Sequence, residues 1–517
     1  MSEAAWDVIV VGAGIAGLSA ALAAREAGAR PLVLEAAPEE HRGGNSAFAA
    51  GAFRLAYGGL EDVLRVVPDL GPEEVETTEF GSYTDAFFED FDRITEGRAD
   101  PELVAVLARE GVDTAAWLRG QGVRFIPNYA SQGYRVGGKM RFRGGSPFHV
   151  SGGGAGLMNA LFAAVERAGI PVAYETRAVS LIHGEDGIEG VRARRGRGVE
   201  AFRAPCVVLA SGGFESNAAW RARYLGPGWD LAKVRGTAFN TGDGLRMGLE
   251  AGASAAGNWS GCHSVAWDLS APEFGDIAVG VDFKKDSYQY GIVVNTDGER
   301  FLDEGADIRT FTYAKYGGVI LRQPHQFAWQ VFDGKVLGLL RDEYRIRQVT
   351  KVRANSIEDL ARNLYRMNSD RFLETVAAFN AAVRTDVPFD PNVKDGRHTV
   401  GLAVPKSNWA NPVDTPPFEA YAVTCGITFT FGGLRITPGA EVVDVAGRPI
   451  PGLYACGSTV GGLFYFNYPG GSGLIAGAVF GRIAGTAAAR AAPGIDADGR
   501  VRRARSSPRS GSRPVGR

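Results

Sequence analysis

The sequence predicts an α/β fold, and three observations support this prediction. Residues 7–11 form a short apolar run, which leads into Gly12-Ala-Gly14-Ile-Ala-Gly17 and then an Ala- and Leu-rich segment to about Gly28. Residues 30–35 form a second apolar run that ends in an acid. Glycine accounts for 71 of the 517 residues, roughly twice the usual share. A strand, a glycine turn, a helix and a second strand within ~30 residues are typical of a βαβ unit with parallel strands.

The glycine turn of this unit predicts a nucleotide-binding site. One glycine permits the tight bend, another lets the backbone approach a pyrophosphate, and a third lets helix and strand pack closely. The N-terminus of the following helix offers free N–H groups and the positive end of the helix dipole to the phosphates. Glu35 lies where an acid can hold the ribose hydroxyls. The cofactor-binding residues predicted in this unit are Gly12, Gly14, Ala16, Gly17 and Glu35.

A second loop of small residues decides which dinucleotide is expected. Gly43, Gly44, Asn45 and Ser46, then Gly51, follow the second strand directly. A long cofactor would continue past its pyrophosphate along this loop, and FAD extends that far. The sequence therefore predicts FAD rather than NAD, bound in part by these five residues.

The α/β pattern continues through the rest of the chain. Apolar strands and helices opened by glycine turns are expected at 152–168, 172–174, 206–213, 452–457 and 470–491. The N-terminus of the last helix can stabilise negative charge on a reduced flavin through its N–H groups. The further cofactor-binding residues predicted along these segments are Ala178, Ala210, Ser211, Gly212, Thr241, Asp243, Gly457, Ser458, Ser472, Gly473 and Leu474.

The length and texture of the chain predict one domain interrupted by another. The FAD-binding domain is expected in two parts, at 1–255 and 421–490. Residues 256–420 are richer in aromatic and charged side chains, with one long helical stretch near 356–384, and predict an inserted α+β capping domain. Residues 491–517 are rich in Arg, Ser, Pro and Gly without periodicity, which predicts a disordered basic tail.

Charge and residue usage exclude several functions. The net charge is −2, and residues 500–517 hold seven Arg and no acid, so residues 1–499 carry −9. No nucleic-acid partner is expected from such a surface. The four cysteines and six histidines show no spacing typical of a metal, haem or iron–sulfur site, so no metal is expected. No apolar stretch reaches the ~18 uninterrupted residues of a membrane span, and no signal peptide precedes the first strand, so a cytoplasmic location is expected.

Several strings of the sequence together resemble one family. Residues 8–17, 43–46, 240–244, 291–301 and 452–457 resemble the FAD-dependent flavoproteins of fumarate reductase and succinate dehydrogenase. The likeness spans residues 5–490. It implies a Rossmann-like FAD-binding domain, split into N- and C-terminal halves, with an inserted capping domain that closes over a carboxylate substrate.

Within that family, four further strings are most similar to tricarballylate dehydrogenase-like proteins. They are residues 259–268, 303–309, 312–316 and 463–474. Where family members with covalent flavin have a histidine, this sequence has Asn45. The resemblance therefore implies noncovalent FAD.

The resemblance also implies two catalytic residues. The family moves a hydride between carbon and flavin N5 while an arginine carries a proton, and Arg309 matches that arginine after one inserted residue. Because arginine normally stays charged, it needs a proton relay, for which the nearby acids are Asp303, Glu304 and Asp307. His263 matches the family histidine that holds a substrate carboxylate.

The family's carboxylate clamp is altered in this sequence. A second family histidine is replaced by Phe429, a clamping arginine by Tyr468, and a Thr-Glu pair by Phe283-Lys284. Losing a bidentate arginine contact removes a strong, geometry-specific interaction, which argues against simple succinate or fumarate. The substrate-binding residues predicted instead are Tyr468, Tyr465, Lys284, Lys315 and Thr430, with Lys285 and Arg143 as further cations.

Three functions are compatible with these patterns. The leading hypothesis is an FAD-dependent dehydrogenase that desaturates a C–C bond next to a carboxylate, with tricarballylate to cis-aconitate as the model reaction. The second is a desaturase or reductase of a cyclic ketone, steroid or natural-product intermediate, which Tyr468 favours and Arg309 and His263 oppose. The third is a flavin-binding protein without turnover. For an enzyme, the expected electron acceptor is an iron–sulfur/haem membrane partner, a quinone or oxygen.

Overall fold

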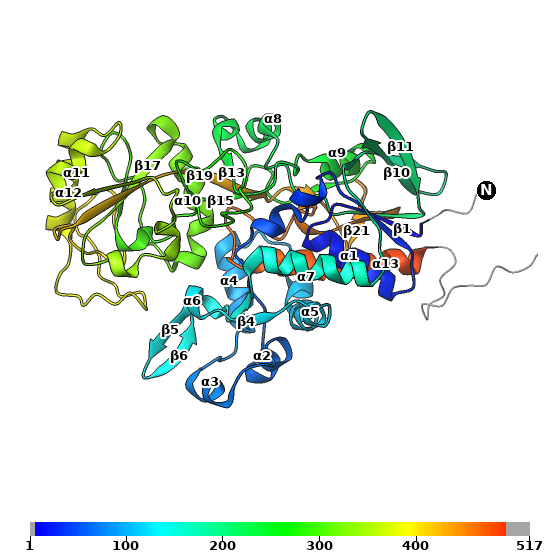
Figure 1. Cartoon of the computed structure of the whole chain (residues 1–517), viewed down its shortest axis with the longest axis horizontal. Coiled ribbons are helices and arrows are strands. Elements are labelled where there is room, and N and C mark those ends of the chain that lie inside the picture. The colour runs from blue at the N-terminus through cyan, green and yellow to red at the C-terminus, as the bar shows by residue number, and fades with distance from the viewer. Residues whose placement is uncertain (1–5, 493–517) are drawn as a thin grey trace, which may run out of the picture.

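The computed structural model describes residues 6–492, and its two largest sheets form the frame of the molecule (Figure 1). The first sheet has the strand order β21-β22-β12-β1-β2-β8. Five of its strands run parallel, with β21 as an antiparallel edge, so the predicted α/β fold is confirmed. These strands are β1 (Val8–Val11), β2 (Pro31–Leu34), β8 (Val172–Ala173), β12 (Cys206–Leu209), β21 (Glu441–Val443) and β22 (Pro449–Ala455).

The first sheet is central because its strands are apolar on both faces. Each residue of β1, β2 and β12 is buried, as expected for parallel strands covered by helices. The helices of the chain are α1 (Ile15–Glu26), α2 (Leu60–Val66), α3 (Pro72–Thr77), α4 (Asp85–Thr95), α5 (Pro101–Gly120), α6 (Tyr129–Gln132), α7 (Gly153–Arg167), α8 (Ala218–Trp220), α9 (Asp243–Glu250), α10 (Tyr313–Leu321), α11 (Ile357–Asn363), α12 (Ser369–Ala382) and α13 (Ser472–Ala491).

Helix α13 packs directly along α1, so the two ends of the described chain share one core. A Cβ at Gly485 of α13 would lie 2.0 Å from the carbonyl oxygen of Ala20 in α1, so only glycine permits this approach. By length and hydropathy α13 could cross a membrane, but 67% of its most apolar 18 residues are buried inside the protein. Residues 493–517 of the predicted tail lie outside the described residues.

The second sheet belongs mainly to the predicted cap and is built around the long strand β19 (Phe418–Thr430). It extends past both ends of the predicted range 256–420, because β13 begins at Lys233 and β19 ends at Thr430. Figure 1 shows β19 running from the region of α11 and α12 toward the first sheet. Its other strands are β13 (Lys233–Val234), β15 (Cys262–Asp268), β16 (Ile292–Val294), β17 (Phe327–Phe332) and β18 (Lys351–Ala354).

Smaller sheets complete the fold. An antiparallel β9-β10-β11 unit flanks the first sheet, and the β5-β6 hairpin projects near α2 and α3 (Figure 1). The remaining strands are β3 (Ala52–Phe53), β4 (Phe125–Pro127), β5 (Gly133–Val136), β6 (Lys139–Phe142), β7 (Phe148–Val150), β9 (Thr176–His183), β10 (Ile188–Arg195), β11 (Gly198–Arg203), β14 (Ala255–Ala256) and β20 (Gly433–Leu434).

The long helix expected near 356–384 is wrong, because the structure has two helices there. Helix α11 ends at Asn363 and α12 begins at Ser369. Between them Arg366 adopts a φ of 57°, which breaks helical geometry. Asn368 then caps the new helix by accepting a hydrogen bond from the Arg371 N–H.

Candidate active site

A cavity of about 210 Å³ follows the carboxyl ends of the first sheet and continues toward the second sheet. We call it the first cavity. Ligands of open parallel sheets bind at this edge, where the strand order reverses around β1 and β12. The predicted cofactor residues that line it are Gly12, Gly14, Ala16, Glu35, Gly44, Asn45, Ser46, Gly51, Ala178, Ala210, Ser211, Gly212, Asp243, Gly457, Ser458, Gly473 and Leu474.

Four predicted cofactor residues, Gly17, Gly43, Thr241 and Ser472, do not line this cavity. Gly17 serves packing, since a Cβ there would lie 1.9 Å from the carbonyl oxygen of Gly12. The Thr241 hydroxyl hydrogen-bonds to Asp243 at 3.1 Å, and the Ser472 hydroxyl donates to the Pro469 carbonyl at 2.5 Å. Gly17, Thr241 and Ser472 therefore act on the conformation of the segments that line the cavity, through packing or hydrogen bonds.

Glu35 closes one end of the first cavity. Its carboxylate accepts hydrogen bonds from the N–H groups of Ala13 and Ala37, both at 2.8 Å. Burial raises the pKa of Glu35, and these N–H bonds act against that rise. The carboxyl group is thus fixed beside the glycine turn, where ribose hydroxyls of a dinucleotide can reach it.

Asn45 lies in the small-residue loop, and both the nitrogen and the oxygen of its side-chain amide form hydrogen bonds. It donates to Glu215 at 2.8 Å and to the Thr428 carbonyl, and its oxygen accepts from the Thr237 N–H at 2.9 Å. Glu215 is completely buried, and burial raises its pKa to about 7, against the hydrogen bond from Asn240. The loop is therefore locked to the second sheet by polar contacts.

The start of α13 differs from the sequence expectation. The Tyr468 hydroxyl accepts the N–H groups of Gly471 at 3.0 Å and Gly473 at 2.9 Å. Two of the N–H groups expected to face a flavin are thus capped by a side chain. An arginine at position 468 has no acceptor atom and could not make this cap.

His263 lies at the opposite end of the first cavity from Glu35, within an aromatic cage. Its ring stacks on Phe429 at 5.2 Å between centroids and meets Tyr313 and Tyr468 edge-on at 5.1 and 4.9 Å. Its Nδ1 is buried without a hydrogen-bond partner among the residues described. Burial, with the nearby charge of Arg235, lowers the pKa of His263 well below its ordinary value. A neutral imidazole therefore faces the cavity.

The sequence analysis missed several residues of the first cavity. Arg235, Tyr313 and Thr428 line the end near His263, and Arg177 also lines the cavity. Arg235 follows the two-residue strand β13, which pairs in parallel with β19. Neither a motif nor a periodicity marks so short a strand, so the sequence carried no local signal for it.

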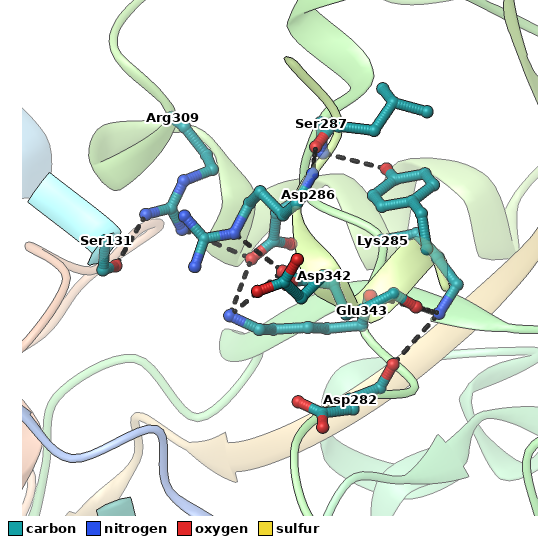
Figure 2. Close-up of polar contacts among 12 residues, drawn as sticks. Ser131, Asp282, Lys285, Asp286, Ser287, Arg309, Asp342 and Glu343 are labelled. Carbon is teal, nitrogen blue, oxygen red and sulfur yellow. Dashed lines mark hydrogen bonds and ion pairs between the residues drawn. The ribbon is translucent and has the colours of Figure 1, made fainter. Parts of the chain in front are cut away.

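Arg309 does not line the first cavity. It lines a second cavity of about 150 Å³, together with Arg143, Arg341 and Asp286. Figure 2 shows the Arg309 guanidinium between Ser131 and Asp286. Its nitrogens lie 3.5 Å from the Ser131 hydroxyl oxygen and 3.3 Å from the Asp286 carboxylate. The Cζ of Arg309 lies 5.7 Å from the ring centroid of Tyr313, and Tyr313 does line the first cavity.

The three acids expected to relay the proton of Arg309 are each committed elsewhere. Asp303 accepts from the Ser407 N–H at 3.0 Å and from its hydroxyl. Glu304 pairs with Arg300 at 2.5 Å, and Asp307 pairs with Arg93 at 2.6 Å and Lys394 at 3.3 Å. The loop after β16 turns these carboxylates away, and Asp286 takes their place as the partner of Arg309.

Asp286 also connects Arg309 to a buried charge cluster in the cap. The Nζ of Lys284 lies 3.7 Å from Asp286 and 3.4 Å from Glu343, and Arg341 pairs with Glu343 at 2.8 Å. Burial lowers the pKa of Lys284, against the charge of Glu343. Burial alone would raise the pKa of Glu343, but Lys284 and Arg341 outweigh it and lower that pKa.

The other predicted substrate residues are spread over the structure. Lys284 is in the buried charge cluster, and Lys285 pairs with buried Asp268 at 3.6 Å. Lys315 is exposed on α10, and the ring of Tyr465 lies against the guanidinium of Arg98. Thr430 lines a small cavity beside the first. Of the five substrate residues predicted from the sequence, only Tyr468 lines the first cavity.

The geometry fits FAD. The first cavity combines a glycine turn at a helix N-terminus, a fixed acid and a small-residue loop that leads to an aromatic cage. Only glycine fits at position 12, because a Cβ there would lie 2.5 Å from the Ala210 carbonyl oxygen. Fold and cavity together define a dinucleotide-dependent oxidoreductase.

Comparisons with known proteins also indicate an FAD-binding protein. Residues 7–475 match the family described as FAD binding domain. A probable fumarate reductase of Shewanella frigidimarina is 31% identical over 94% of this chain and 75% of that protein. A vinyl phenol reductase of Lactiplantibacillus plantarum is 28% identical over 89% of this chain and 90% of that protein. A 3-oxosteroid 1-dehydrogenase of Mycobacterium tuberculosis is 24% identical over 92% of this chain and 96% of that protein.

A solved structure shares the fold over almost the whole chain. The open conformation of a flavocytochrome c3 fumarate reductase superposes with a TM-score of 0.71 at 28% identity, covering 95% of this chain and 79% of that one. The chain belongs to the FAD-binding family of fumarate reductase and succinate dehydrogenase flavoproteins. It is an FAD-dependent oxidoreductase, as the first two sequence hypotheses expected.

Proposed function

We propose that the protein is an FAD-dependent dehydrogenase that desaturates a CH–CH bond next to a carboxylate, with tricarballylate to cis-aconitate as the model reaction. FAD, when bound, accepts the hydride from the substrate carbon. The observation that carries the proposal is the position of Arg309, which is held by Asp286 and lies beside Tyr313 of the first cavity. The substrate would lie where the two cavities approach each other at Tyr313.

Arg309 would take the proton from the carbon next to the one that loses hydride. A guanidinium is normally protonated, so Arg309 can act as a base only if its proton is first passed on. Asp286, at 3.3 Å, is the group placed to receive it. Lys284, at 3.7 Å, and then Glu343 continue this line of charged groups away from Arg309.

The second cavity supports a substrate with more than one carboxylate. Arg143 is fixed there by hydrogen bonds to the Pro391 carbonyl at 3.1 Å and to the carbonyl and side-chain oxygens of Asn392 at 3.2 and 3.1 Å. Within residues 6–492, no carboxylate forms an ion pair with Arg143. A positioned cation without an ion-pair partner favours an anionic group in the cavity that it lines.

Two further features belong to the proposal. Asn45 offers an amide instead of the histidine that bonds covalent flavin, so FAD is held without a covalent link and acid precipitation should release it. Electrons must leave the reduced enzyme for a separate acceptor, because the chain has no cysteine or histidine spacing for a haem or cluster. The candidates are an iron–sulfur/haem membrane partner and a quinone.

A second function is favoured by the aromatic cage. Tyr313, Tyr468 and Phe429 surround His263 and give the first cavity an apolar wall. Such a wall suits a ring-bearing substrate, and relatives include a vinyl phenol reductase and a 3-oxosteroid 1-dehydrogenase. The second candidate is therefore desaturation or reduction of a cyclic ketone or an aryl compound.

Anaerobic titration of the FAD-loaded enzyme separates the two. We expect tricarballylate to bleach the flavin absorbance, and Arg309→Ala to retain FAD but slow bleaching by about 10²- to 10⁴-fold. Arg345→Ala is the matched control, because Arg345 is 54% exposed and its one ion pair among residues 6–492 is with exposed Asp342. Undiminished bleaching in Arg309→Ala contradicts the role of Arg309. Bleaching by 4-ethylphenol or a 3-ketosteroid, but by no carboxylic acid, selects the second candidate.

A further inference from the structure

Two arginines line the first cavity, and they differ in their counter-charges. Arg177 pairs with Asp243, with 2.8 Å between Nε and Oδ2. Arg235 forms no ion pair with any residue from 6 to 492. Its side chain is nevertheless buried, with 6% of the residue exposed. A buried charge without a partner is costly, so it calls for an anion from outside the chain.

The position of Arg235 is fixed by the second sheet. Its backbone N–H donates to the Ile427 carbonyl at 2.7 Å, which continues the pairing of β13 with β19. The guanidinium makes one long hydrogen bond, 3.4 Å from Nη1 to the Thr428 hydroxyl. Its Nε is buried and has no partner among the described residues. At least one donor is thus left for a ligand in the cavity.

His263 provides a second unsatisfied polar atom at the same place. Its Nδ1 is buried without a described partner, and the charge of Arg235 is close enough to lower the pKa of the imidazole. Both side chains line the first cavity at its aromatic end. One group that accepts hydrogen bonds and carries negative charge satisfies both.

The phosphates of FAD do not fit this position. They belong at the glycine turn and the N-terminus of α1, which border the first sheet. Arg235 instead follows β13, and His263 lies in β15, and both of these strands pair with β19 of the second sheet. The anion at Arg235 is therefore a different group from the pyrophosphate. A carboxylate matches the planar donor edge of a guanidinium.

We infer that Arg235 binds a carboxylate of the substrate in the first cavity, with His263 hydrogen-bonded to the same group. This inference rests on the proposed function and narrows its substrate class to acids that place a carboxylate beside the flavin. Arg235 would thus provide the positive charge that is lost where Tyr468 replaces the clamping arginine of the family. Acids with a further carboxylate would reach Arg143 in the second cavity, whereas neutral phenols and ketosteroids leave Arg235 without a counter-charge.

Ligand binding to the oxidised holoenzyme tests this inference without turnover. Malonate has no CH–CH bond to desaturate, so it serves as an inert probe whose binding perturbs the flavin absorbance. We expect Arg235→Gln to retain FAD and to bind malonate about 10- to 100-fold more weakly than the wild type, as the loss of a charge-assisted contact requires. Binding of neutral p-cresol should change less than twofold. Arg345→Gln removes the same charge at an exposed site and should leave both constants unchanged.

A second variant keeps the test decisive if Arg235→Gln loses FAD or does not fold. Arg235→Lys retains the charge but loses the planar fork, and we expect FAD content to be kept and malonate binding to weaken several-fold. Unchanged malonate affinity in either folded variant overturns the inference. A shifted flavin reduction potential with unchanged malonate affinity also overturns it, because Arg235 would then serve the cofactor. If malonate affinity depends on Arg235 but no acid bleaches the flavin, the inference stands and the proposed dehydrogenase function fails.

Discussion

The two cavities are lined by different residues, and they differ in what shapes them. The first cavity, where it follows the first sheet, is shaped by backbone: a glycine turn, a helix N-terminus and one fixed acid, Glu35. The second cavity is shaped by charged side chains of the cap, with Arg309, Asp286 and Arg341 on its wall. Cofactor binding in the first cavity therefore depends on glycines that let the backbone come close to the cofactor. Substrate chemistry in the second cavity depends on the pairing of its buried cations and carboxylates.

The largest effect is expected from filling the backbone cradle. Gly12→Ala places a methyl group 2.5 Å from the Ala210 carbonyl oxygen, at a φ of 105° that side chains rarely adopt. We expect the purified variant to contain almost no FAD, measured as the ratio of flavin to protein absorbance. Gly71→Ala is the control, because no atom lies within 4 Å of its added Cβ. A variant at Gly12 with full FAD content would show that the cradle does not bind the cofactor.

The next largest effect is expected from unbalancing the charge cluster. Asp286→Asn leaves Arg309 and Lys284 with one buried carboxylate fewer, and removing one partner of a buried pair costs about 3–5 kcal/mol. Urea unfolding of the holoenzyme should show this loss while FAD content stays complete. Asp342→Asn, whose side chain is fully exposed, should unfold like the wild type. Loss of FAD in Asp286→Asn would mean that FAD binding in the first cavity depends on the charge cluster at the second cavity.

A smaller, pH-dependent effect is expected at Glu215, whose carboxyl group accepts a hydrogen bond from Asn45 of the cofactor loop. Burial raises its pKa to about 7 from 4.5, so the folded state holds a proton that the unfolded state releases between these pH values. Stability from this group is complete below pH 4.5 and is lost as the pH rises to about 7, by about 3 kcal/mol in total. Glu215→Gln is neutral throughout, so its melting temperature should fall less than that of the wild type from pH 5 to pH 8. Parallel curves for the two proteins would contradict a buried, protonated Glu215.

The features that the sequence predicted are those encoded locally. The turn from Gly12 to Gly17 and the acid at Glu35 lie in one unit of about 30 residues, so spacing alone places them correctly. The helix expected at 474–491 is present as α13, because its glycine loop and apolar run are contiguous. Backbone requirements of this kind leave a signature within a short window.

The features that the sequence did not predict are assembled from distant segments. Asp286 precedes Arg309 by 23 residues and reaches it only because the loop after β16 turns back, while the nearer Asp303 is held by Ser407. Arg235 hydrogen-bonds to Thr428 because it directly follows β13, and this strand of two residues is too short to show a periodicity in the sequence. Tyr468 lines the first cavity, but the sequence did not predict that its hydroxyl caps α13. Tertiary pairing decided each of these outcomes.

The long strand β19 has a mechanical consequence. Its first half pairs with β17 and β18 in the cap, and its last residues contact the cofactor loop through the Thr428 carbonyl and Asn45. A continuous ladder of thirteen residues resists bending, so a tilt of the cap acts on the cofactor loop as a lever. If the cap opens to admit a substrate, β19 would carry that movement to the loop that holds Asn45 and so couple the entry of substrate to the binding of the cofactor.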